Sequence, residues 1–407
     1  MRIWEAVRMA AGSLRAHKLR SVLTLIGVII GVVAVVIVMS LIAGLNLHVT
    51  TKVADMGSNT FGIDKFGLIT DFKQYLAALK RNKDLTLDDM RALRESAPLL
   101  EEVGAQTDIR LNIKYRDLEM REIVIQGATA NMLYLDTSQQ VDLGRYLNAS
   151  DVEHKRNVCF IGSDIAKRLY TGVDPLDKEL KINGIPFQVI GIAKENGSIF
   201  GQSEDVFVVI PISTFQKMYG SRESIFIRAR GRQDVPIEQA QDQARLLLRA
   251  RHHLKFNDPD DFGIISAEAI KDLWQQLTGI LAAVAVGITS ISLVVGGIVI
   301  MNIMLVAVTE RTREIGVRKS LGARRRDILW QFLAESVLMS GSGGLIGLLI
   351  AYLATMLITT SLQLPFIMPL SAVILAISVS MGVGLIFGIY PAWKAARLDP
   401  IVALRQE

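Results

Sequence analysis

The sequence predicts a membrane protein with four transmembrane helices and a large α+β extracytoplasmic domain inserted between the first and second helices. The mean hydropathy of +0.35 over 407 residues is too high for an ordinary soluble chain and too low for a chain that lies wholly in a membrane. Four segments each contain roughly 20 or more mostly apolar residues, which is the length that crosses a bilayer core. A polar stretch of normal globular composition separates the first two segments.

The N-terminal segment precedes the first span. Residues 1–20 alternate apolar and basic positions at helical spacing, which predicts an amphipathic helix lying in the membrane interface. The apolar segment Ser21–Leu45 follows. It is far longer than the core of about 7–15 residues in a cleaved signal peptide, so we expect a retained first span.

The polar stretch 46–276 contains mixed helix and strand patterns. Thr86 provides a cap signal for a helix, and "VGAQTDIRLNIKY" and "EMREIVIQGAT" alternate as strands. "PIEQAQDQARLLLRARHHL" reads as a helix and "FGIISAEAI" as a strand, while Asn183-Gly184 predicts a hairpin turn. We therefore expect a two-part α+β module, residues 46–128 and 221–276, with a mostly β insertion at 129–220.

Three more spans are predicted after this domain, at Leu277–Val308, Ile328–Ser361 and Leu370–Ala392. The first two of these exceed the minimum length, so we expect tilt or continuation into water. Residues 309–327 form a basic connector between them, and residues 393–407 form a tail.

Small residues occur in the spans at intervals that favour close helix packing. The glycines predicted to serve this packing are Gly27, Gly31, Gly343, Gly347, Gly384 and Gly388.

The distribution of charge predicts the orientation of the protein. Of the 45 Lys and Arg residues, 30 lie between Asn46 and Gln276, and the other 15 flank the spans on the opposite side. Basic residues near span ends stay in the cytoplasm. We therefore expect a multi-pass protein of the bacterial inner membrane, with both termini and the connector cytoplasmic and the large domain outside. Topology and contact with anionic lipid account for the net charge of +5, so no nucleic-acid partner is predicted.

The sequence lacks the common motifs of catalysis and metal binding. It contains no G-x-x-x-x-G-K-[ST] phosphate loop, H-E-x-x-H, CxxC or G-x-S-x-G motif. The single cysteine, Cys159, lies in an apolar run and is expected to be a small buried side chain. We expect a chain that is not an enzyme and binds no cofactor or metal.

The basic connector has the pattern of a short helix. Glu314 lies four residues before Arg318, and Gly322 lies where a helix would end. A helix rigidly joined to two spans is suited to docking into a groove on a partner, with Ile315, Val317 and Leu321 as apolar anchors. Exposed rim charges such as the one on Arg311 would then contribute about 1 kcal/mol or less. A solvated positive-inside loop is the alternative.

The segment "NIMLVAVTERTREIGVRKSLGARRRDI" closely resembles the corresponding segment of MacB-like ABC permeases, within the wider FtsX-like group. The resemblance extends to "LRAHKLRSVLTLIGVIIGVVAVV" at the first span, to the Ser/Gly-rich third span and to "GIYPAWKAARLDPIVALRQE". The patches "VIGIAKENG" and "LGRYL" are similar to the outer domain of the family. The match therefore covers most of the chain.

The resemblance implies a permease that is a homodimer of four-span protomers, each engaging one ABC ATPase subunit, so two ATPases per complex. ATP and Mg would be bound by those partners, and the ATPase would be a separate chain because this sequence begins at the first span. The outer domain would have a "porter" part at 46–128 and 221–276 and a "sabre" insertion at 129–220. The residues assigned to the coupling helix are Glu310, Arg311, Arg313, Glu314, Ile315, Gly316, Val317, Arg318, Lys319, Leu321 and Gly322.

The implied function is mechanotransmission. ATP-driven closure of the dimer would move the outer domain and export a drug, a peptide or a lipid-like substrate from the periplasmic side. A periplasmic adaptor and an outer-membrane channel are further partners that the family implies. Two alternatives remain: a lipoprotein-release permease of the same fold, and an FtsX-like signal transmitter that controls a cell-wall hydrolase. The large two-part outer domain disfavours the transmitter.

Overall fold

A computed structural model describes residues 18–55, 59–136, 139–199, 202–220, 224–362 and 365–405. These residues form two compact units. The helical unit contains the described residues up to Leu47 and those from Gln276 onward, and the mixed-sheet unit spans His48–Gln275. The interfacial helix predicted for residues 1–20 lies outside the described residues, except for 18–20 at the start of the first described helix.

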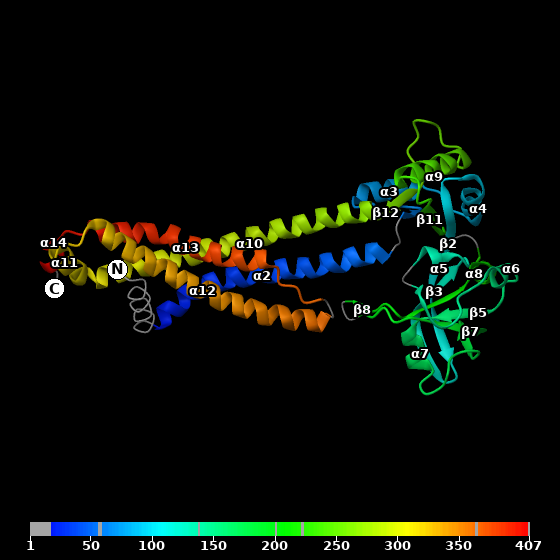
Figure 1. The fold of residues 1–407 in the computed structure, drawn as a ribbon, viewed down its shortest axis with the longest axis horizontal. Helices are drawn as coiled ribbons and strands as arrows, with labels where there is room; N and C mark the ends of the chain where they lie inside the picture. Colours follow the sequence, from blue (N-terminus) through cyan, green and yellow to red (C-terminus); the bar gives the residue numbers. More distant parts are fainter. Residues whose placement is uncertain are drawn as a thin grey trace. The chain divides into compact units, whose positions relative to one another are not determined.

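Among the described residues, four long helices have the length and apolar composition of membrane spans, which agrees with the predicted number. They run side by side in Figure 1 and are α2 (Lys18–Asp55), α10 (Ala267–Glu310), α12 (Arg325–Leu362) and α13 (Leu370–Arg397). Two short helices are also described in this unit, α11 (Thr312–Ser320) and α14 (Pro400–Arg405).

Helix α10 begins about ten residues before the predicted start of the second span. The strand predicted for "FGIISAEAI" ends at Ser266, because the Ser266 hydroxyl accepts a hydrogen bond from the Ala269 amide at 3.1 Å. This contact satisfies one of the unpaired N–H groups in the first helical turn. The apolar pattern of the segment does not distinguish a strand from the first turn of a capped helix.

All six predicted packing glycines lie at contacts between helices of the helical unit. A Cβ atom at Gly27 would lie 2.6 Å from the Gly296 Cα, so α2 and α10 touch backbone to backbone. Gly31 faces α10 as well, Gly343 and Gly347 on α12 face α2, and Gly384 and Gly388 on α13 face the serines of α12. Because a glycine contributes no side chain of its own, the neighbouring helix approaches closely at each of these positions.

The mixed-sheet unit is built on one large sheet and a small two-stranded one. The strand order of the large sheet is β12-β1-β11-β2-β3-β10-β5-β7-β4, with β6 pairing both β2 and β7. Among the described strands, only the β3–β10 and β5–β7 pairs are parallel. The strands before the insertion and after it are β1 (Thr60–Asp64), β2 (Leu100–Tyr115), β3 (Leu118–Ala128), β11 (Phe226–Gly231) and β12 (Gly263–Ser266).

The helices outside the insertion are α3 (Phe72–Arg81), α4 (Leu87–Ser96) and α9 (Ile237–Arg251). Helix α4 starts at the predicted cap: the Thr86 hydroxyl accepts from the Asp89 amide, and the Asp89 carboxylate accepts from the Thr86 amide. Helices α4 and α9 cover a core formed with β1, β2 and β11, which includes the fully buried Phe61 and Leu93.

The insertion contains helices as well as strands. Its strands are β4 (Val141–Gly144), β5 (Val158–Ile161), β6 (Glu179–Ile182), β7 (Ile185–Ala193), β8 (Ser198–Ile199), β9 (Gln202–Ser203) and β10 (Phe207–Pro211). Its helices are α5 (Met132–Leu135), α6 (Ala149–Glu153), α7 (Ser163–Leu169) and α8 (Ile212–Tyr219). The predicted turn at Asn183-Gly184 joins β6 to β7, with both residues in the left-handed region at φ +48° and +84°.

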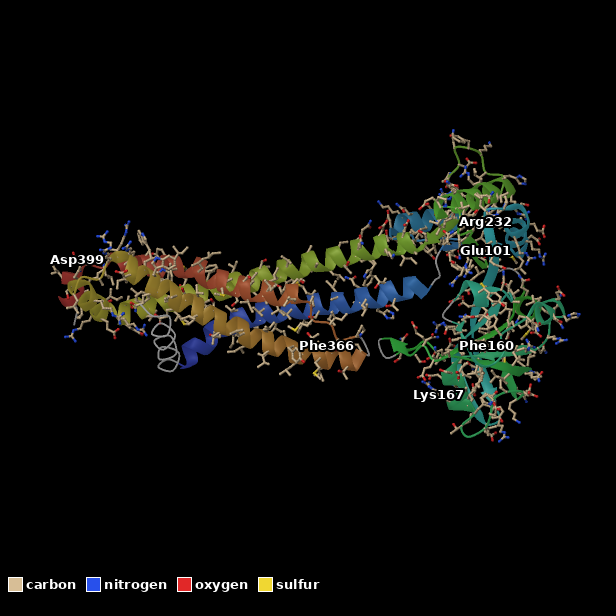
Figure 2. All side chains as sticks on the ribbon, viewed as in Figure 1. Glu101, Phe160, Lys167, Arg232, Phe366 and Asp399 are labelled. Carbon is tan, nitrogen blue, oxygen red and sulfur yellow. The ribbon has the colours of Figure 1, made fainter. Side chains whose placement is uncertain are left out.

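Two further cores lie in the insertion, one on each face of its strands. The first contains Cys159 and Phe187, and the second contains Phe160, which is fully buried (Figure 2). The first core also includes Ile113 and Ile125 from β2 and β3. The boundary expected at residue 129 therefore does not separate the packing of the two parts, because the long β2–β3 hairpin contributes side chains to both.

Candidate functional site: the connector between α10 and α12

The connector is helical, as its sequence pattern predicts, and it is continuous with α10 except at one residue. The chain departs from helical geometry at Arg311 and resumes as α11 at Thr312. The Thr312 hydroxyl donates to the carbonyl oxygens of Val308 (3.0 Å) and Thr309 (2.8 Å), and it is buried. These bonds hold the end of α10 and the start of α11 together.

A glycine ends α11 in the expected position. The Gly322 amide donates to the Lys319 carbonyl and the Ala323 amide to the Arg318 carbonyl, both at 3.1 Å. This pair of bonds is the Schellman motif, which needs a left-handed residue at its centre, and Gly322 has φ +97°. A glycine adopts that conformation without steric cost, so the chain can leave the helix here and enter α12.

The inner face of α11 packs into the helical unit. Ile315 is 1% exposed and belongs to the same core as Ile328 and Phe332 of α12 and Ala392 of α13. Gly316 is buried beside it, and α11 also packs against α14. The Asp399 carboxylate, labelled in Figure 2, caps α14 by accepting from the Ile401 amide at 2.9 Å.

Two cationic side chains of the connector bind the neighbouring helices. The Arg311 guanidinium donates to both carboxylate oxygens of Glu335 on α12, at 3.2 and 3.4 Å. The Lys319 ammonium donates to the carbonyl oxygens of Ala396 (2.7 Å) and Leu398 (2.6 Å) at the end of α13, where helix carbonyls lack partners. Burial, together with the nearby Arg325 charge, lowers the pKa of Lys319 below its ordinary value.

These contacts fix the connector in position. One cation attaches it to α12 and the other attaches it to α13, so α11 is joined to both helices by charged contacts as well as by its apolar core. We therefore expect a displacement of α11 to move the start of α12 and the end of α13 with it.

The outer face of α11 is exposed. Arg313, Glu314, Val317 and Leu321 are exposed, with Leu321 at 83% and Val317 at 42%. The Glu314–Arg318 pair, expected from its spacing, lies at 3.8 Å along the helix surface. Large exposed apolar side chains on a charged helix are typical of a protein interface.

The structure divides the predicted coupling residues into two groups. Glu310, Arg313, Glu314, Val317, Leu321 and Gly322 are exposed, and Arg318 is half-buried. The inner group comprises Arg311, Ile315, Gly316 and Lys319, which contact the rest of the chain. Ile315, which was expected to contact a partner, is instead part of the protein's own core. Arg311, which was expected to be a rim charge, binds a carboxylate that is 7% exposed.

Several residues of this site were not predicted from the sequence, among them Thr312, Ala396 and Leu398. Glu335 is a further such residue, although a carboxylate inside an apolar span usually has a partner. The backbone carbonyls of Ala396 and Leu398 carry no sequence signal, because any residue supplies the same group.

Residues 21–247 match the family model of the MacB-like periplasmic core domain, and residues 286–400 match that of the FtsX-like permease C-terminal region. The macrolide export ATP-binding/permease protein MacB of Bdellovibrio bacteriovorus is 33% identical over 97% of this chain and 60% of its own length. The protein of the same name from Azoarcus sp. is 34% identical over 99% of this chain and 60% of its own length.

The chain thus spans about 60% of the length of these curated relatives. Among solved structures, the periplasmic region of MacB from Actinobacillus actinomycetemcomitans is 20% identical, with a TM-score of 0.46. That alignment covers 56% of this chain and 97% of the solved one.

Proposed function

This chain belongs to the family of MacB-like permeases with an FtsX-like C-terminal region, and from that membership we propose that it is the permease subunit of an ABC exporter driven by a partner ATPase. The sequence has no phosphate loop, so the proposal assigns ATP hydrolysis to that partner. Two permease copies with two ATPases form the proposed assembly.

The observation that carries this proposal is the division of α11 into a fixed face and a free face. The inner face is held by Ile315, Arg311 and Lys319, and the outer face presents Val317 and Leu321 to solvent among charged residues. A rigid helix with a free apolar face can receive a force from a docked ATPase and pass it to α10, α12 and α13. This is the mechanotransmission that we propose.

The proposed substrate is an amphipathic molecule, either a drug, a peptide or a lipid-like compound, captured outside the membrane. The relatives described above are named for macrolide export, so a macrolide is the first compound to test. We expect a macrolide to increase ATP hydrolysis by the reconstituted complex. Hydrolysis that is unchanged by macrolides would direct the search to peptide and lipid substrates.

The outer face of α11 is tested by placing a charge at its most exposed apolar residue. Leu321→Asp is expected to weaken ATPase binding by about 2 kcal/mol or more, because interface energy is concentrated in a few apolar anchors. Retention of the ATPase on the immobilised permease and substrate-stimulated hydrolysis in vesicles are the measurements. Leu321→Met, which keeps an apolar side chain of similar size, is the matched control. If Leu321→Asp and Val317→Asp both bind the ATPase and support ATP hydrolysis as wild type does, the connector only joins two helices.

The proposed orientation places the mixed-sheet unit outside and the connector in the cytoplasm. A cysteine at the exposed Lys181 should react with a membrane-impermeant maleimide in intact cells, and one at the exposed Arg324 should react only after lysis. The native thiol gives little background, because Cys159 is fully buried and burial raises its pKa. The reverse labelling pattern would contradict the orientation.

A further inference from the structure

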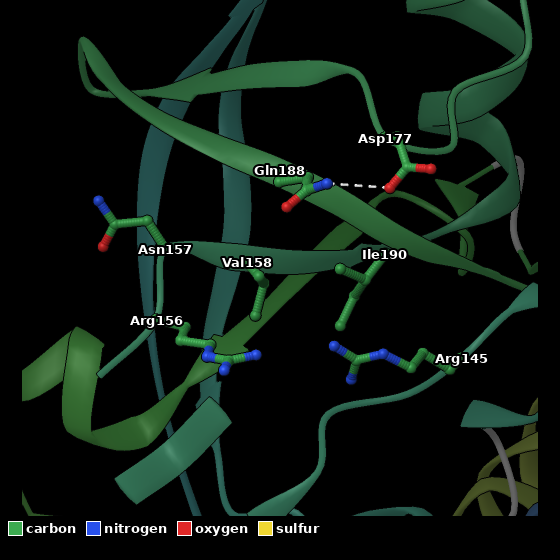
Figure 3. A pocket seen from close by; sticks show the side chains of 7 residues that line it. All are labelled: Arg145, Arg156, Asn157, Val158, Asp177, Gln188 and Ile190. Atoms are coloured by element: carbon green, nitrogen blue, oxygen red, sulfur yellow. Dashed lines mark hydrogen bonds between the residues drawn. The ribbon is translucent and has the colours of Figure 1, made fainter. Parts of the chain in front are cut away.

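A polar cavity lies in the mixed-sheet unit, in a part of the sequence that showed no binding motif. Its volume is about 470 Å³, which is within the usual range for sites that bind small molecules. Figure 3 shows its lining from four separate segments: Arg145 after β4, Arg156 and Asn157 before β5, Asp177 before β6, and Gln188 and Ile190 on β7.

The floor of the cavity is apolar and belongs to the sheet. Val158 is 6% exposed, and Ile190 packs partly buried against the same core. In the parallel pair β5–β7, Val158 is the register partner of Gln188. Because side chains alternate along a strand, Gln188 and Ile190 project from the same face of β7. The sheet therefore fixes the positions of the apolar floor and of the Gln188 side chain.

One side of the cavity carries two arginines. Arg145 is held in place: its Nη1 donates to an oxygen of Asp151 at 2.6 Å and to the Tyr146 carbonyl at 3.0 Å, and its Nη2 donates to the other Asp151 oxygen at 3.3 Å. Asp151 is fully buried and also accepts from the Asn148 amide at 3.1 Å. Although burial alone would raise the pKa of Asp151, its bonds with Arg145 and Asn148 hold that pKa below the ordinary value.

The second arginine is not needed to satisfy Asp151. The nearest Arg156 nitrogen is 3.6 Å from the Asp151 carboxylate, beyond hydrogen-bond distance, and the side chain is 54% exposed. Two guanidinium groups thus share one carboxylate, which leaves one positive charge without compensation on this side. Within the described part of the chain, the Arg156 guanidinium makes no hydrogen bond, so its N–H donors are available.

The opposite side of the cavity carries acceptors. The Gln188 amide donates to an Asp177 oxygen at 2.9 Å (dashed line in Figure 3), which fixes its carbonyl oxygen as an acceptor. Asp177 is itself fixed, because its amide donates to the Val189 carbonyl at 2.9 Å. The cavity therefore has donors with a net positive charge on one side and oriented acceptors on the other.

We propose that this cavity binds a small hydroxylated anion. Its phosphate or carboxylate group is held by Arg156 and by the unused N–H groups of Arg145, since guanidinium groups bind such anions through paired, charge-assisted hydrogen bonds. Two hydroxyl groups of the same ligand donate, one to the Gln188 carbonyl oxygen and one to the Asp177 carboxylate. The apolar floor of Val158 and Ile190 lies under the carbon skeleton. A phosphorylated sugar has all three features, whether it is free or part of a lipid headgroup.

The test measures binding of glucose 6-phosphate to the full chain in detergent by titration calorimetry, with glucose as the uncharged comparison. Glucose 6-phosphate is expected to bind and glucose is not. Arg156→Gln is expected to raise the dissociation constant about tenfold or more, the usual effect of losing a charged hydrogen bond. Arg168→Gln is the matched control, because Arg168 is similarly exposed at 59% and pairs with Asp164 on α7.

A second variant tests the acceptor side. Gln188→Ala is expected to remove the preference for glucose 6-phosphate over inorganic phosphate, while inorganic phosphate still binds to the arginines. Both variants should unfold at the wild-type temperature. In Arg156→Gln, Asp151 keeps its bonds to Arg145 and Asn148, and in Gln188→Ala the side chain removed is an exposed one. Failure of glucose 6-phosphate and inorganic phosphate to bind wild type, or equal binding by Arg156→Gln and Arg168→Gln, would overturn the proposal.

A competition experiment separates the two sources of the ligand. Short-chain phosphatidylglycerol and free glycerol 1-phosphate are each used to displace bound glucose 6-phosphate. If phosphatidylglycerol displaces it at the lower concentration, the ligand is a lipid headgroup. Displacement by free glycerol 1-phosphate alone identifies a soluble ligand. Each result supports the anion site, provided that Arg156→Gln weakens the displacement.

Discussion

Ile315→Asp is expected to destabilise the helical unit by about 3–5 kcal/mol, the range measured when a buried charge is left without a partner. Ile315 is 1% exposed within a core shared by α12 and α13, so an aspartate there would lose apolar contacts and place a carboxylate among hydrocarbon side chains. We expect lower yields of folded protein, earlier thermal aggregation in detergent and loss of coupled transport.

The control for Ile315→Asp is the same substitution two residues further along the helix. Val317→Asp adds the same charge to α11 but on the outer face, where the side chain is 42% exposed. Its thermal stability should equal that of wild type, whereas its binding to the ATPase should fall. Equal thermal stability of Ile315→Asp and Val317→Asp would mean that α11 is not packed as described.

Arg311→Ala is expected to lower the stability of the helical unit by about 3 kcal/mol or more, because it leaves the Glu335 carboxylate of α12 without its partner. Glu335 is 7% exposed, and its two oxygens lie 3.2 and 3.4 Å from the Arg311 guanidinium. From the sequence, Arg311 was expected to be a rim charge of small effect. That expectation is wrong for this geometry, since the partner carboxylate is buried.

A double variant distinguishes an ion pair from a simple loss of packing. Arg311→Ala combined with Glu335→Gln removes the unpaired charge, so stability in detergent should recover substantially relative to Arg311→Ala alone. The coupled ATPase activity should recover less, because the attachment of the connector to α12 is still weakened. No recovery of stability in the double variant would show that the Arg311 stem, and not its charge, supports the helix.

Much of the helical unit could be predicted because its signals are long. A run of about 20 apolar residues is specified by many positions together, so single exceptions do not hide it. The glycine spacing indicated which faces pack, but it did not indicate the partner helices. Gly296 was not predicted because it has no second glycine four residues away. Its role in packing is seen from its contact with Gly27.

The orientation of α11 could not be predicted from its nine residues. Ile315, Val317 and Leu321 are all apolar, and their spacing places Ile315 about 200° around the helix from Val317. A helix with apolar residues on both sides gives no direction for its buried face. The bonds from Lys319 to two backbone carbonyls help to set which face of α11 is buried, and such acceptors have no signature in the sequence.

The short helices of the insertion were missed for a related reason. Helix α6 has five residues and α5 has four, which is too few for a helical period to be seen. The cavity between Arg145 and Gln188 was missed because its lining comes from four segments that only the sheet brings together. Predicting it would have required the strand order.

That strand order also determines when each part of the chain can fold. β1 lies between β11 and β12, and Thr60 pairs with Arg230, so this strand is synthesised about 170 residues before its first partner. The insertion and the β2–β3 hairpin, whose partners are much nearer in sequence, can form while β1 still has both edges unpaired. An unpaired strand is a template for association with other chains. Completion of the sheet therefore waits for β12, the last segment made before α10, and until then β1 keeps at least one edge open to association with other chains.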